Sequence, residues 1–174
     1  MKPGATLKRF FAGISEHVFQ AELGVADPPL VDYVTEMLLR FFRWDALHKV
    51  RHLNGRPVTE VAEMLSEANQ RVGSAKRDVH RHIGDFTLFW TGLYPESLRR
   101  MTGPDKKDHF IDYCSHGKRA YLIAATMEDD QSDAPSEVLE RLSHEFEMCA
   151  YGLREIRREW ERRDDGHSGM LLIE

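Results

Sequence analysis

The feature that most constrains the fold is an apolar period of three and four residues that recurs along most of the chain. It is clearest between residues 75 and 93, at Val79, Ile83, Phe86, Trp90 and Leu93. A helix places such positions on one face, whereas a half-buried strand needs strict alternation, which is nearly absent here. The sequence therefore predicts an all-α fold.

The same segment carries a second row of small or polar residues, at His80, Gly84, Thr87 and Thr91. Small residues allow another helix to approach closely, and a helix that is apolar over most of its circumference belongs inside a bundle. We expect helices over residues 29–47, 75–93 and 105–127 to be central and largely buried. The complete chain is then a helical bundle of five to six long helices.

The last helix is expected to run unbroken from Pro135 to residue 163. Its apolar positions alternate by three and four residues, at Leu139, Leu142, Phe146, Cys149, Leu153, Ile156 and Trp160. This spacing is typical of a coiled-coil seam. At about 1.5 Å per residue such a helix is about 43 Å long, more than a small domain covers. The pattern predicts a homodimer.

The length of 174 residues fits one domain, which we place at residues 1–163. Residues 164–169 contain two glycines and a serine and predict a flexible hinge. The remaining residues, 170–174, read Met-Leu-Leu-Ile-Glu and form an apolar tail. Such a tail is either disordered or docked in a groove of its own chain or of a neighbour.

Composition argues against two classes of partner. The net charge of −5 disfavours nucleic acid, which selects basic surfaces. A faint helix-turn-helix pattern at residues 58–65, followed by Lys76 and Arg77, lacks the tight glycine turn and is too apolar for a groove. No run reaches the roughly 18 apolar residues of a membrane span, and no signal peptide is visible. We expect a cytoplasmic protein in which Cys114 and Cys149 are reduced and buried.

The segment Arg81-His82-Ile83-Gly84-Asp85-Phe86-Thr87-Leu88-Phe89-Trp90-Thr91-Gly92-Leu93-Tyr94-Pro95-Glu96 follows Glu22-Leu23-Gly24-Val25-Ala26-Asp27-Pro28-Pro29-Leu30 in the chain. Together these segments resemble a family of uncharacterised bacterial proteins, and the similarity would cover most of the chain. The resemblance implies a free-standing bacterial cytoplasmic protein. It implies no activity, cofactor or catalytic residue.

The first candidate site consists of His80, Arg81, His82 and Asp85. On a helix, Arg81 and Asp85 are four residues apart and His82 and Asp85 three, so one carboxylate can meet both side chains. A carboxylate held by arginine that orients an imidazole suits acid–base work or ligand binding. The same set is also what a central helix needs if its polar side chains are to pair with one another. Both interpretations stay open.

The second candidate is a metal site at His109, Asp112 and His116, whose spacing puts all three on one helical face. Imidazole and carboxylate are ligands for zinc or iron. A bundle metal site recruits ligands from several helices, and the obvious partner set is Glu140, His144 and Glu147. Both sets are equally compatible with solvent-facing stripes.

The sequence shows neither a nucleophile motif nor a phosphate-binding glycine loop. We therefore expect, first, a non-enzymatic interaction or assembly protein that forms a homodimer. The alternative is a helical bundle that binds a small molecule or metal, with catalysis at the His/Asp cluster as an option. No cofactor, substrate or protein partner is identified by the residues.

Overall fold

The computed structural model describes residues 3–42, 60–100 and 109–165. These residues form eight α-helices and one π-helical segment, with no strand among them. The all-α prediction is confirmed, but the expected five to six long helices are not. Two differences account for this. Residues 95–100 form a separate short helix, and the predicted last helix is divided into two.

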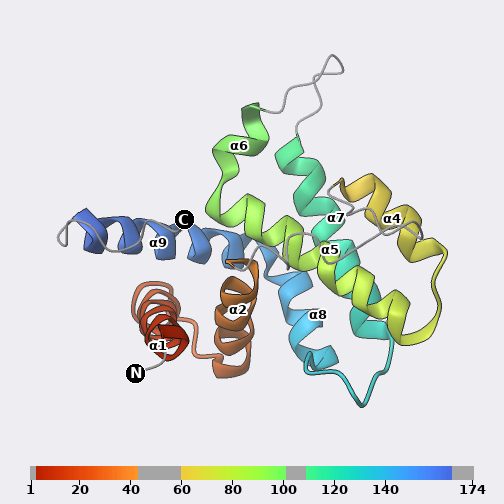
Figure 1. The fold of residues 1–174 in the computed structure, drawn as a ribbon, viewed down its shortest axis with the longest axis horizontal. Helices are drawn as coiled ribbons and strands as arrows, with labels where there is room; N and C mark the ends of the chain where they lie inside the picture. The colour runs from red at the N-terminus through yellow and green to blue at the C-terminus, as the bar shows by residue number, and fades with distance from the viewer. Residues whose placement is uncertain (1–2, 43–59, 101–108, 166–174) are drawn as a thin grey trace.

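Helix α5 (Gly73–Leu93) crosses the middle of the molecule, and the other helices are arranged around it (Figure 1). Every residue from Val79 to Phe89 is buried. Two of the buried polar side chains of α5 form hydrogen bonds within the helix. The hydroxyls of Thr87 and Thr91 donate to the carbonyls of Ile83 and Thr87, four residues earlier. The prediction of a buried central helix is confirmed most fully here.

Helix α7 (His109–Thr126) packs most closely on α5, through small residues on both sides. A Cβ atom on Gly84 would lie 2.5 Å from the ring of Tyr121, and one on Gly117 would collide with the hydroxyl of Thr87. The row of small residues on α5 therefore allows another helix to approach closely, as the sequence predicted. Unlike α5, α7 has a solvent face, with Ser115, Arg119 and Leu122 exposed.

The N-terminal part consists of α1 (Pro3–Glu16), the π-helical segment η1 (His17–Glu22) and α2 (Pro28–Phe41). Gly24 has φ +68°, as expected for a glycine that follows a helix end. The Asp27 side chain accepts from the Leu30 amide at 3.2 Å and caps α2. One face of α2 is buried, whereas Asp32 and Glu36 on the other are exposed. Of the helices that the structure describes, α5 alone is buried on every side, over residues 79–89.

Two shorter helices lie beside α5: α4 (Val61–Asn69) and α6 (Pro95–Arg100). In α4, Val61 and Ala68 are buried. The C-terminal end expected for the helix over residues 29–47 lies outside the described residues, from residue 43 on.

The predicted long last helix is interrupted at Glu145, so α8 (Ser136–His144) and α9 (Phe146–Asp165) are separate helices. The reason lies in their partners, because α8 packs mainly on α7 whereas α9 packs mainly on α5. The seam residues Leu139, Leu142, Phe146, Cys149, Leu153 and Ile156 are fully buried inside this one chain. The seam therefore offers no face to a second copy, and homodimer formation loses this support. Helix α9 ends two residues into the expected hinge, and residues 166–174 lie outside the described residues.

Candidate functional site

Helix α5 carries three charged side chains, one per turn, into the interior of the protein. Arg77, Arg81 and Asp85 are only 1%, 6% and 3% exposed. Burying a charge is costly unless it is paired and hydrogen-bonded, so each of these residues needs partners from other helices. Their partners divide the row into two clusters, one around Asp85 and one around Arg77.

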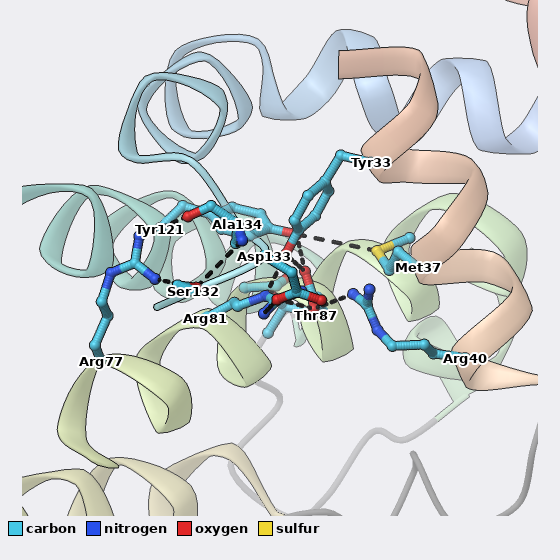
Figure 2. A network of polar contacts seen from close by, with 12 residues as sticks. Tyr33, Met37, Arg40, Arg77, Arg81, Thr87, Tyr121, Ser132, Asp133 and Ala134 are labelled. Carbon is cyan, nitrogen blue, oxygen red and sulfur yellow. Dashed lines mark hydrogen bonds and ion pairs between the residues drawn. The ribbon is translucent and has the colours of Figure 1, made fainter. Parts of the chain in front are cut away.

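The carboxylate of Asp85 is held by side chains from three helices. Figure 2 shows these side chains, Tyr33, Arg40, Arg81 and Tyr121, converging. The hydroxyls of Tyr33 and Tyr121 both donate to Oδ1, each at 2.7 Å. Arg40 donates to Oδ2 at 2.9 Å, and Nε of Arg81 lies 4.0 Å from the same oxygen. We call these five residues the Asp85 cluster; it joins α2 and α7 to α5.

Arg81 and Arg40 also lie against the ring of Tyr33. Their guanidinium carbons are 5.4 and 5.5 Å from the ring centroid, within the range of a cation–π contact. Arg81 donates from Nε to the Tyr33 hydroxyl at 3.0 Å and from a terminal nitrogen to Asp133 at 2.6 Å. The side chain of Asp133 is 79% exposed, so this ion pair reaches the surface.

Electrostatics fix the protonation of the two tyrosines. Burial, followed by the charge of Asp85, raises the pKa of Tyr33 and of Tyr121 well above the ordinary tyrosine value. Both phenols therefore stay protonated and act as hydrogen-bond donors to the carboxylate.

A surface cavity of about 430 Å³ lies directly beside the Asp85 cluster. Tyr33, Arg40 and Arg81 line it together with the acidic residues Asp32, Glu36 and Asp133. Pro29, Pro135 and Val138 supply its apolar surface. The cavity thus lies between α2, α5 and the start of α8.

The Arg77 cluster is different, because its guanidinium meets main-chain carbonyls and hydroxyls. Nε donates to the carbonyls of Ala124 and Met127 at 3.2 and 2.7 Å, and one terminal nitrogen donates to that of Ala134 at 2.7 Å. The other terminal nitrogen donates to Ser132 at 2.7 Å. Arg77 therefore caps the C-terminal end of α7, where the helix dipole favours a cation, and holds the loop to α8. Figure 2 shows it apart from Arg40, on the far side of Arg81.

Only part of the first predicted site is brought together. Arg81 and Asp85 meet as expected, whereas His82 stacks on Phe41, with ring centroids 5.8 Å apart. His80 is 4% exposed, and burial, with the charges of Lys76 and Arg119, lowers its pKa. Neither imidazole is among the groups that hold Asp85.

The second predicted site receives no support from the geometry. The side chain of His109 lies outside the described residues, and Asp112 and His116 are partly exposed on α7. In the partner set, His144 lies 3.8 Å from Glu140 on the surface of α8, and Glu147 pairs with Lys118. Within the described ranges, no three His, Cys, Asp or Glu side chains are grouped closely enough to hold a metal ion. The set at His109, Asp112 and His116 stays a prediction.

Two further expectations concern α5 and the cysteines. Arg77, which a helix-turn-helix would direct into a DNA groove, is buried. Cys114 and Cys149 are both buried and no disulfide joins them. Burial raises the pKa of Cys149 to about 12, so its thiol stays protonated.

Sequence reasoning missed Tyr33, Tyr121 and Asp133, and it did not connect Arg40 with Asp85. In the structure, Glu36 pairs with Lys8 at 2.6 Å and Arg40 turns to Asp85. Tyr33, Met37 and Arg40 share a helical face by their spacing of four and three residues, which was the available signal.

No family model matches the chain, and neither a curated protein nor a solved structure matches it significantly. The resemblance to uncharacterised bacterial proteins stays a prediction. In the part of the chain that the structure describes, no helix has the length and apolar character needed to cross a membrane.

Proposed function

We propose that this protein binds a small polar molecule in the cavity beside the Asp85 cluster. One observation carries the proposal: the nearly buried guanidinium of Arg81 lines, with Arg40, a surface cavity of about 430 Å³. Binding sites for small ligands are typically roughly 300–1,000 Å³ and combine apolar walls with a few converging polar groups. The cavity meets both conditions.

The Asp85 cluster supports binding because it fixes the two arginines before a ligand arrives. Tyr33 and Tyr121 hold the Asp85 carboxylate, and Asp85 in turn holds Arg40. Side chains fixed in this way lose less conformational entropy when a ligand binds. A cluster that only locked helices together would have no need of a cavity over its cations.

The same groups favour binding over acid–base catalysis. A catalytic acid or base works best when its pKa lies near the working pH. The pKa of each cluster tyrosine is raised far from neutrality, and that of Cys149 is raised to about 12. Arg40 and Arg81 are suited to hold an anionic group in place.

A thermal-shift screen tests the proposal. Wild-type protein, Arg40→Gln and the control Arg158→Gln, whose arginine is 65% exposed on α9, are screened against amino acids, carboxylates, sugar phosphates and nucleotides. We expect at least one class to raise the Tm of the wild type and of Arg158→Gln, but not of Arg40→Gln. No stabilisation by any class, or equal stabilisation of all three proteins, would contradict the proposal.

Self-association as a homodimer stays a separate prediction. With the heptad seam buried inside the chain, it rests on the apolar tail at residues 170–174. Light scattering of the complete chain and of a chain lacking these residues tests it. A monomer mass for both would end the assembly hypothesis.

A further inference from the structure

The cavity has an ordered distribution of charge, with cations at its base and anions at its rim. The side chains of Arg40 and Arg81 are 34% and 8% exposed, so they form the base. Asp32, Glu36 and Asp133 are exposed and form the rim. A ligand that matches this arrangement carries a negative group at its inner end and a positive group close behind it.

We propose that the ligand is a zwitterion, namely a free α-amino acid with an apolar side chain. The inference rests on the proposed function and specifies the chemical class of its ligand. The carboxylate would lie on the two arginines, the ammonium group among the rim carboxylates, and the side chain against the apolar wall.

The base is able to take one carboxylate. Arg40 uses one terminal nitrogen for Asp85, and Arg81 uses Nε for Tyr33 and one terminal nitrogen for Asp133. Among the contacts of the described residues, the second terminal nitrogen of each guanidinium has no acceptor. Two guanidinium donors match the two oxygens of a carboxylate. Asp85 pairs with Arg40 and Asp133 with Arg81, so the base is suited to a single carboxylate that binds the unused donors of both guanidinium groups.

The rim is able to take one ammonium group. Glu36 is paired with Lys8 and Asp133 with Arg81, so both rim carboxylates already accept one cation. Asp32 lies one helical turn before Glu36 on the exposed face of α2 and brings a third carboxylate. An ammonium group has three donors and needs several acceptors at once.

The same rim selects against other anions. Phosphates and dicarboxylates would place a second negative charge beside Asp32, Glu36 and Asp133, and like charges at short range oppose binding. The wall of Pro29, Pro135 and Val138 offers no hydrogen-bonding side chain, so it suits an apolar substituent. These features together favour an apolar amino acid over a sugar phosphate or a nucleotide.

Titration calorimetry on the full chain tests the class with L-leucine, L-valine, L-proline and L-phenylalanine as probes. For the tightest of them, the N-acetyl derivative lacks the ammonium charge and the amide derivative lacks the carboxylate. We expect each derivative to bind at least about tenfold more weakly, because each leaves a charged partner group in the cavity without its match.

Three variants separate the two ends of the ligand. Arg40→Gln should weaken binding of the amino acid by about tenfold or more, and Asp32→Asn by a smaller factor of about three, since Asp32 is exposed. Asp32→Asn is chosen because an exposed residue leaves the fold intact. The control Glu137→Gln removes an exposed carboxylate on α8 that does not line the cavity, and should leave affinity unchanged.

The outcomes distinguish this inference from the proposed function. Equal binding of the N-acetyl derivative and the free amino acid would overturn the zwitterion and leave a simple anion site. Binding of another class in the thermal-shift screen, with none of the four amino acids binding, would overturn the inference alone. If no compound binds in either experiment, both proposals fail.

Discussion

Arg77 and Arg81 lie one turn apart on α5 and are buried to a similar degree, yet they have opposite surroundings. Arg77 donates to carbonyls and a hydroxyl at the end of α7 and in the loop to α8, and all three of its nitrogens are used. Arg81 donates to a phenol and to a surface carboxylate, and it lines a cavity. Burial of a cation therefore does not mark a site by itself; what distinguishes Arg81 is that it lines a cavity and keeps one terminal nitrogen without an acceptor among the described residues.

The buried charges of Arg77 and Arg81 are stabilised in different ways. Arg77 is stabilised by oriented dipoles at the C-terminal end of α7, which act as a partial negative charge. Arg81 is stabilised by Asp85 beneath it and Asp133 above it. A ligand can therefore reach Arg81, which lines the cavity, but not Arg77, whose acceptors belong to the folded main chain.

The largest expected effect comes from removing the anion between Arg40 and Arg81. Asp85→Ala should lower the free energy of unfolding by about 3–5 kcal/mol, because it leaves the buried hydroxyls of Tyr33 and Tyr121 without their acceptor and Arg40 without its counter-charge. Urea unfolding followed by circular dichroism measures this. Asp78→Ala, on the same helix but partly exposed, is the control and should cost below about 1 kcal/mol. Equal costs for the two variants would show that the Asp85 cluster does not tie the helices together.

The next largest effect is expected at Arg77. Arg77→Met should cost about 2–3 kcal/mol, since the carbonyls of Ala124, Met127 and Ala134 lose a donor inside the protein. Ligand affinity should stay within about twofold of the wild type, because Arg77 does not line the cavity. Calorimetry on the same variant checks this. A loss of affinity as large as that of Arg40→Gln, without a loss of stability, would abolish the distinction between the two arginines.

A smaller effect on stability is expected at Arg81. Arg81→Met should cost about 1–2 kcal/mol, because Arg40 and the two tyrosines still hold Asp85. The double variant Asp85→Ala/Arg81→Met should cost less than the sum of the two single variants, since both side chains belong to one hydrogen-bonded cluster. Urea unfolding of all three variants completes the cycle, and strictly additive costs would argue against direct coupling.

The smallest effect is expected at Asp133. Its hydrogen bond with Arg81 lowers the pKa of the carboxyl, so the folded state binds its proton less readily than the unfolded chain. The resulting stabilisation is complete well above pH 4 and is lost as the pH falls through the lowered pKa. Because the side chain is 79% exposed, Asp133→Asn should cost below about 1 kcal/mol at pH 7. Stability curves of the two proteins should converge in acid, and a constant gap from pH 7 to pH 3 would refute the ion pair.

The sequence predicted those parts of the fold that follow from one helix at a time. The spacing of Val79, Ile83 and Phe86 located α5 to within two residues, and the Gly84 row foretold the close approach of α7. The interruption at Glu145 was missed because neither glycine nor proline marks it and the seam continues through it. The interruption results from tertiary packing, because α8 packs on α7 whereas α9 packs on α5.

In the candidate site too, only contacts within one helix could be predicted from the sequence. Arg81 and Asp85 were found because both lie on α5, four residues apart. Tyr33 and Tyr121 are separated from Asp85 by 52 and 36 residues, and spacing along the chain carries no information on such contacts. In the same way, the spacing of His82 to Asp85 says nothing about Phe41, the aromatic neighbour that α2 brings to His82.

The carbonyl acceptors of Arg77 have a consequence for how this chain can change over generations. Every residue type offers a main-chain carbonyl, so the bonds from Arg77 to positions 124, 127 and 134 survive substitutions there that preserve the local path of the chain. The arginine itself has no substitute with as many donors in a planar fork. Among natural variants of this protein, positions 124, 127 and 134 should therefore accept many residue types, whereas position 77 should remain arginine.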